Sequence, residues 1–220
     1  MKRVLILSGG SISTKFAKEY LKNQVFDIII AADHGLKAVE ELQLPVDYIL
    51  GDFDSVPSHI LEKYKELSEE GQKITFKQYD PEKDETDTQI AIELALELDG
   101  EEIVILGATG TRIDHLLGNI HSLYIPLKLN KNAYIIDEHN KIYLLNQDTL
   151  LSKEQLYGPN LSLIPLTETV TGVTLEGFKY PLSKVDMHIG ESLGVSNEVI
   201  SSKAQIKLKS GIFVVIESKD

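Results

Sequence analysis

The stretch Tyr48–Ser55, YILGDFDS, decides how the rest of the chain can be read. Its first residues are apolar and predict a short buried strand, which ends at Gly51. Asp52 and Asp54 then follow, separated by one residue. In open α/β folds, ligands bind in the loops at the carboxyl ends of the strands. The pair is therefore either a cation site or two solvated carboxylates in an ordinary turn, because Asp and Ser also favour turns.

Similar strands precede and follow this stretch. Apolar or alternating runs predict further strands at residues 4–7, 27–32, 74–79 and 102–106. Helical spacing follows each strand, around residues 16–21, 36–42, 61–67, 90–98 and 116–123, and Pro126 is expected to stop the last helix. Strands that alternate with helices predict a doubly wound, mostly parallel sheet. Right-handed crossovers then bring all the carboxyl ends of the strands to one edge.

Charged residues gather in the loops expected at that edge. They follow successive strands and are Asp33, Asp52, Asp54, Lys83, Asp84, Asp87, Arg112 and Asp114. A single acid there is an ordinary turn or cap residue, but the recurrence indicates a cation site. Thr86 is expected to cap the next helix, with Gln89 completing a capping box.

The chemistry of these loops is narrowed by what the sequence lacks. Neither G-x-x-x-x-G-K-[ST] nor G-x-G-x-x-G occurs, and the net charge of −12 argues against a nucleic acid or an anionic membrane as partner. Clustered carboxylates suit Mg²⁺, which also takes phosphate oxygens as ligands. Lys83 and Arg112 are candidate phosphate contacts. The alternative for Lys83 is a solvated loop residue. The alternative for Arg112 is an ion pair with Asp114.

The second half of the chain has a different pattern. Short strands separated by glycine, proline and asparagine turns predict an antiparallel β-sandwich, so we expect an α/β domain at residues 1–129 and a β-sandwich domain at 130–220. There are no cysteines, no apolar run long enough to span a membrane and no signal-peptide core, which together predict a cytoplasmic protein.

Taken in order, the loop motifs resemble those of thiamine pyrophosphokinase over nearly the whole chain. The matching segments are Ala31–Asp33, Gly51–Ser55, Lys83–Asp87, Gly107–Gly110, Arg112–His115, Gly177–Leu182 and Gly194–Glu198. The resemblance implies transfer of a pyrophosphate group from ATP to the hydroxyl of thiamine, giving thiamine diphosphate and AMP. It also implies a homodimer with thiamine bound near the interface, between one α/β domain and the β domain of the partner.

The resemblance also implies roles for individual residues. Asp52, Asp54 and Asp87 match Mg²⁺ ligands. The expected reaction also needs a carboxylate to accept the proton from thiamine, and Asp87 and Asp114 are the candidates. The positions that match the nucleotide and thiamine pocket are Asp33, Asp84, Thr86, Arg112 and Asp114, with Ser196 and Asn197 on the thiamine side; Lys83 remains a candidate phosphate contact. Tyr180 is either a core residue or a ligand contact. His34 and Thr111 depart from the family pattern, which often has glycine at both positions.

Two other functions compete with this one. Asp52–Val56 imitates the D-x-D-x-[TV] loop of haloacid-dehalogenase-like phosphatases, with Asp52 as the nucleophile, but that loop normally follows the first strand of its sheet and here it follows the third. A non-catalytic sensor of nucleotide or thiamine is the second alternative.

Overall fold

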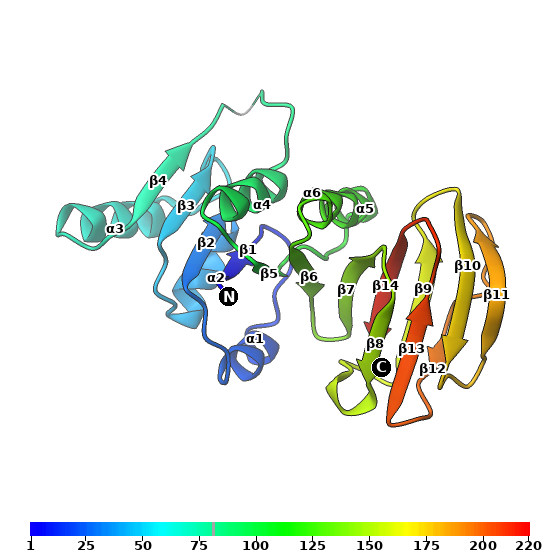
Figure 1. Ribbon diagram of the computed structural model, residues 1–220. Helices are drawn as coiled ribbons and strands as arrows, with labels where there is room; N and C mark the ends of the chain where they lie inside the picture. The colour runs from blue at the N-terminus through cyan, green and yellow to red at the C-terminus, as the bar shows by residue number, and fades with distance from the viewer. Residues whose placement is uncertain (81) are drawn as a thin grey trace. The chain divides into compact units, whose positions relative to one another are not determined.

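A computed structural model describes residues 1–80 and 82–220 and divides into two compact units, Met1–Glu138 and His139–Asp220 (Figure 1). Pro81, which follows the strand predicted at residues 74–79, lies outside the described residues. The division falls later than the expected 129/130, because β6 (Asn132–Ile136) pairs in parallel with β5 (Glu102–Leu106) and so belongs to the first sheet.

The first unit contains a parallel sheet with the strand order β6-β5-β1-β2-β3-β4. The remaining strands are β1 (Arg3–Leu7), β2 (Ile28–Ala32), β3 (Tyr48–Gly51) and β4 (Thr75–Gln78). β2 is buried along its whole length, whereas β4, at the edge of the sheet, has no buried residue. This difference explains why the central strands are apolar runs and β4 alternates.

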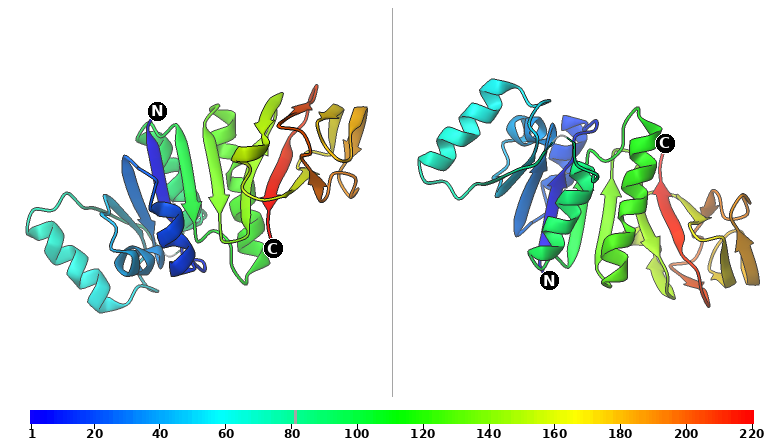
Figure 2. Two further views of the ribbon diagram at one scale, coloured as in Figure 1. Left: turned by 90° about the horizontal axis from the view of Figure 1, so that it is seen from below. Right: turned by 90° about the horizontal axis from the view of Figure 1, so that it is seen from above.

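Helices connect consecutive strands of this sheet (Figures 1 and 2). α1 (Thr14–Leu21), α2 (Gly35–Leu42) and α3 (Ser58–Glu69) follow β1, β2 and β3, and α2 contacts both α1 and α3. α4 (Asp87–Glu97) leads back across the sheet to β5, and contacts α5 (Ile113–Ser122) and α6 (Tyr124–Lys128). Since the strand order runs in opposite directions from β1, right-handed crossovers place these two sets of helices on opposite faces.

Pro126 does not stop the last helix, contrary to expectation. α5 ends at Ser122, and Pro126 lies in the first turn of the separate short helix α6. Proline is tolerated there because the first N–H groups of a helix have no partner within the helix.

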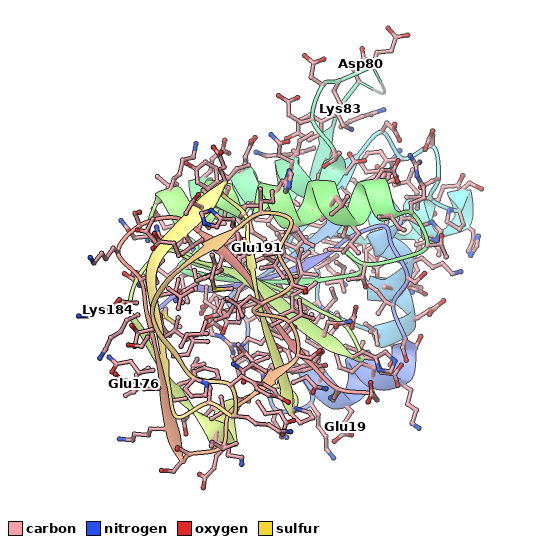
Figure 3. The ribbon with its side chains drawn as sticks, turned by 90° about the vertical axis from the view of Figure 1, so that its right-hand side faces the viewer. Glu19, Asp80, Lys83, Glu176, Lys184 and Glu191 are labelled. Atoms are coloured by element: carbon pink, nitrogen blue, oxygen red, sulfur yellow. The ribbon has the colours of Figure 1, made fainter. Side chains whose placement is uncertain are left out.

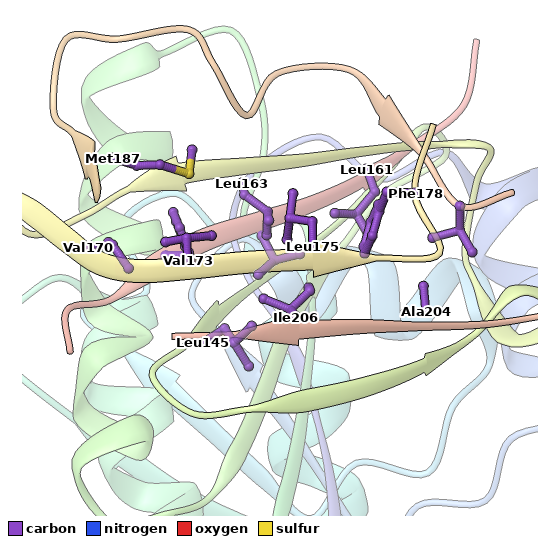
Figure 4. Close-up of a cluster of buried hydrophobic side chains, with 13 residues drawn as sticks. Leu145, Leu161, Leu163, Val170, Val173, Leu175, Phe178, Met187, Ala204 and Ile206 are labelled. Atoms are coloured by element: carbon purple, nitrogen blue, oxygen red, sulfur yellow. The ribbon is translucent and has the colours of Figure 1, made fainter. Parts of the chain in front are cut away.

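The second unit is an antiparallel β-sandwich, as predicted. In this unit, one layer consists of the adjacent strands β12-β9-β14-β7 of the larger sheet and the other is the four-stranded sheet β11-β10-β13-β8. The strand bounds are β7 Asn140–Leu145, β8 Thr149–Ser152, β9 Asn160–Pro165, β10 Thr169–Glu176, β11 Leu182–His188, β12 Asn197–Glu198, β13 Lys203–Lys207 and β14 Phe213–Ser218, with a 3₁₀ turn at Lys153–Gln155. Leu161 and Leu163 of one sheet pack with Val173 and Ile206 of the other in a single buried cluster (Figure 4).

Candidate active site

Three predicted acids meet at the carboxyl edge of the first sheet. One carboxylate oxygen from each of Asp33, Asp52 and Asp54 lies within 4.8 Å of the other two. β2 and β3 are neighbours, so the loops that follow them start side by side, and the N–H of Asp33 donates to the carbonyl of Leu50 at 2.7 Å. A Cβ atom on Gly51 would lie 3.1 Å from Asp33 Cα, and Gly51 has φ +143°. Glycine at this position therefore allows the two loops to approach closely.

Among the described residues, the hydrogen bonds of this cluster leave one buried oxygen without a partner. Ser55 Oγ donates to Asp33 Oδ2 at 2.5 Å, and the N–H of Asp54 donates to Asp52 Oδ1 at 3.1 Å. Among the described residues, Asp33 Oδ1 is buried and has no hydrogen-bond partner. A buried carboxylate oxygen beside two further carboxylates fits a hard divalent cation, which takes oxygen ligands of this kind.

The negative charges of the neighbouring carboxylates raise the pKa of Asp54, as is expected where carboxylates converge on a cation site. The pKa of Asp54 is raised, first by the charge of Asp52 and a hydrogen bond with it, then by slight burial and by the charges of Asp33 and Asp87. Like charges held this close disfavour ionisation. A positive ion among them would reverse that effect.

Asp87 is the first residue of α4, directly after the neighbouring loop, and is paired with a lysine. Lys83 Nζ donates to Asp87 Oδ1 at 2.6 Å, and its side chain is only 13% exposed. The ammonium group also lies 5.7 Å from the centre of the Tyr79 ring. Lys83 is therefore held in place, and the solvated alternative does not describe it; Figure 3 labels it in the loop between β4 and α4.

Only one of the two hydrogen bonds of the predicted capping box forms at the start of α4. Thr86 Oγ1 accepts a hydrogen bond from the N–H of Gln89 at 3.2 Å. The Gln89 carboxamide does not return to Thr86 but donates to Glu93 at 2.9 Å. Thr86 also borders a hollow of about 300 Å³ between α4 and the α5–α6 segment. Asp84 is exposed.

Arg112 and Asp114 form an exposed ion pair. The guanidinium donates through Nε at 3.2 Å and through Nη2 at 2.6 Å to the two oxygens of the carboxylate. The hydrogen bond from Arg112 is the main cause that lowers the pKa of Asp114 to about 2, helped by the N–H of His115. The same pairing raises the pKa of Arg112.

In the second unit, the side chains of Ser196 and Asn197 have different surroundings. Ser196 is exposed, whereas Asn197 is buried. The Asn197 carboxamide accepts from the N–H groups of Tyr180 and Glu198 and donates to the carbonyl of Tyr180 at 2.9 Å. Tyr180 as a whole residue is 58% exposed, so it is a surface residue and not part of the core.

Three supporting contacts were not predicted. Ser55 lies in the opening stretch, directly after the acid pair, and its hydroxyl was the available signal. The buried hydrogen bond between Ser8 and Thr88, at 2.6 Å, ties the first turn of α4 to the end of β1. Asn119 holds the loop before α5 by donating to the carbonyl of Ala108 at 2.8 Å. The partners in these two hydrogen bonds are 80 and 11 residues apart in the sequence, so no local motif marks them.

Family models match both units. Residues 17–135 match "Thiamin pyrophosphokinase, catalytic domain" and residues 148–213 match "Thiamin pyrophosphokinase, vitamin B1 binding domain". The fold and the two matches define an ATP-dependent transferase with a catalytic domain and a separate vitamin-binding domain.

Relatives of known sequence or structure agree with this class. A thiamine pyrophosphokinase of Bacillus subtilis is 34% identical over 177 residues, which is 80% of each chain. A crystal structure of thiamine pyrophosphokinase from Bacillus subtilis superposes with a TM-score of 0.86 at 30% identity, and one of a family protein from Enterococcus faecalis with a TM-score of 0.80 at 31% identity; both cover 100% of the two chains compared.

The chain belongs to the thiamine pyrophosphokinase family, and its activity is the transfer of a pyrophosphate group from ATP to thiamine. The phosphatase and sensor alternatives find no support in these comparisons. Across residues 1–80 and 82–220, no helix has the length and apolar character needed to cross a bilayer.

Proposed function

We propose that transfer takes place at the acidic edge of the first unit, with Mg²⁺ held by Asp33, Asp52, Asp54 and Asp87. The observation that carries this proposal is the meeting of three carboxylates within 4.8 Å, one of which has a buried oxygen without a partner among the described residues. Asp33 joins the expected ligands because its free oxygen belongs to this cluster. Asp87 is included because it matches a Mg²⁺ ligand position of the family, although its oxygens lie outside the group of three.

A cation explains how a chain with a net charge of −12 binds ATP, which is itself an anion. When bound, Mg²⁺ would neutralise phosphate charge as the pyrophosphate group is transferred. Lys83 and Arg112 are the cationic side chains placed among the acids, and both are held by carboxylates, at 2.6 Å from Asp87 and Asp114 respectively. Both are suited to contact phosphate oxygens and to stabilise the charge that develops there.

Of the two candidate acceptors of the proton from the thiamine hydroxyl, Asp114 is the less suitable. A general base works best when its pKa lies near the operating pH. The Arg112 guanidinium holds the pKa of Asp114 at about 2, which makes that carboxylate a weak base. Asp87, whose Oδ1 accepts a hydrogen bond from Lys83, is the other candidate.

Thiamine binds to the second unit through Ser196 and Tyr180, with Asn197 in a supporting role. Ser196 and the Tyr180 ring are exposed, while the Asn197 carboxamide is occupied by the backbone of Tyr180 and Glu198. Asn197 therefore fixes the direction in which the Tyr180 ring is presented. The Lys179 ammonium lies 5.7 Å from the centre of this ring, and the flat, positively charged thiazolium of thiamine suits its other face.

The second unit also supplies the surface for a homodimer with thiamine near the interface. Exposed apolar side chains in this unit include Ile189, Leu193 and Val195, which precede Ser196 in one loop segment. Contiguous exposed apolar residues are typical of protein interfaces.

In the first unit, the pocket for the nucleotide and thiamine also includes Asp84 and Thr86.

The proposal is tested with ATP labelled at either the β- or the γ-phosphate. Pyrophosphate transfer moves both labels to thiamine and yields one AMP for each thiamine diphosphate, and a chelator of divalent cations stops the reaction. ADP with the γ label alone on thiamine, or release of inorganic phosphate, contradicts it. Turnover that persists without any divalent cation contradicts the assigned role of the acidic cluster.

A further inference from the structure

We propose that Ser55 and His34 are positioning residues that form a clasp around Asp33 and leave one defined oxygen of that carboxylate for the cation. The proposal rests on the metal site described above and adds two side chains that do not themselves touch the metal or the substrates.

The clasp consists of two hydrogen bonds between the loops after β2 and β3. Ser55 Oγ donates to Asp33 Oδ2 at 2.5 Å. The carbonyl of the same serine lies 3.2 Å from His34 Nδ1. Because a carbonyl oxygen only accepts, His34 Nδ1 carries the proton and donates. His34 thus holds the backbone of Ser55, while the hydroxyl of Ser55 holds the carboxylate of Asp33.

The backbone of Asp33 shows why a clasp is needed. Asp33 has φ +46°, in the left-handed region that residues other than glycine seldom adopt. Its N–H is bound to the Leu50 carbonyl at 2.7 Å, and Gly51 lies against its Cα. The main chain of Asp33 is therefore fixed, and the side-chain torsions that turn its carboxylate are the freedom that remains.

Ser55 removes that remaining freedom. A hydroxyl bound to an ionised carboxylate forms a short, charge-assisted hydrogen bond, as this one is. With Oδ2 engaged, Oδ1 is the oxygen left buried and unpartnered among the described residues. Side chains that orient metal ligands in this way typically change metal affinity by about 10- to 100-fold when they are removed.

The test uses Mn²⁺ as the probe, with its affinity measured by electron paramagnetic resonance in the absence of ATP and thiamine. S55A should weaken Mn²⁺ binding by about 10-fold or more. S55T, which keeps the hydroxyl, should restore most of the affinity, and H34A should weaken binding in the same direction as S55A. S58A, the same substitution at an exposed serine in the first turn of α3, serves as the matched control and should bind like the wild type.

Steady-state kinetics give a second readout. S55A should raise the KM for the metal–ATP complex while the KM for thiamine stays at the wild-type value, a split that a general loss of structure does not produce. Equal Mn²⁺ affinity in S55A and wild type overturns the clasp but leaves the metal site intact. Failure of S55T to recover affinity also overturns it. Absence of Mn²⁺ binding by the wild type overturns the metal site itself, and the clasp with it.

Discussion

Replacing Asp54 by asparagine keeps the size of the side chain and removes one of the carboxylates that meet within 4.8 Å at the edge of the first sheet. Asparagine is a weaker ligand for a hard divalent cation because it carries no charge. A catalytic metal ion supplies several kcal/mol of charge stabilisation in the transition state. If D54N removes about 3–4 kcal/mol of this transition-state stabilisation, kcat/KM falls by about 100- to 1,000-fold.

The same change should not destabilise the metal-free protein. The pKa of Asp54 is raised in the folded state, chiefly by Asp52. Between its ordinary pKa and the raised one, the folded state binds more protons than the unfolded state, so stability falls as pH rises through that window. D54N has no carboxylate at this position and so escapes this loss of stability. At neutral pH its melting temperature should therefore equal or exceed that of the wild type. Because Asp54 is exposed, solvent screening keeps the difference small.

The assay combines steady-state kinetics at saturating Mg²⁺ with thermal melts in the presence of a chelator. D99N is the matched control: it makes the same chemical change at an exposed residue after α4, at the opposite end of the strands. It should leave kcat/KM unchanged. Wild-type turnover by D54N refutes the assignment of Asp54 as a metal ligand, and a clearly lower melting temperature shows that its role is structural.

Three further substitutions test other parts of the site. R112K keeps the charge but loses the planar fork, so NMR titration should find the pKa of Asp114 above the value of about 2 held by Arg112; an unchanged pKa contradicts the assigned cause. In the wild type, the stabilisation from this pair is present above the ordinary carboxyl pKa and is lost as pH falls through about 2. Y180A should raise the KM for thiamine about tenfold, with the KM for ATP unchanged and Y180F close to wild type; an equal loss in both variants argues against ring contact. N197A leaves backbone groups of Tyr180 without partners and should lower the free energy of urea unfolding by about 1–3 kcal/mol, and wild-type stability contradicts this.

The parallel sheet was predictable because burial on both faces makes its central strands continuous apolar runs. β2 is such a run and is buried throughout. β6 was assigned to the second domain because its short apolar pattern resembles that of the strands after it. Whether such a strand pairs in parallel depends on its register with β5 and on the crossover that contains α5 and α6, which its own residues do not encode.

The candidate site was predictable as a set of loops, but not in its detailed contacts. Asp52 and Asp54 are marked by their spacing, and Asp33 joins them because β2 and β3 are neighbours. The left-handed backbone of Asp33 and the bond from Ser55 arise from the approach of two loops, so no local pattern predicts them. Asn197 looks like a ligand contact in the sequence, and its buried bonds to Tyr180 are visible only in the fold.

The central claim is that the cation which lets this acidic chain use ATP sits among Asp33, Asp52, Asp54 and Asp87. Anomalous diffraction from crystals grown with Mn²⁺ and a non-hydrolysable ATP analogue tests it most directly. We predict an anomalous peak coordinated by Asp33 Oδ1 and by carboxylate oxygens of Asp52 and Asp54, with phosphate oxygens completing the coordination. A nucleotide bound in the same crystals with no Mn²⁺ at this cluster, or with Mn²⁺ only elsewhere, contradicts the claim.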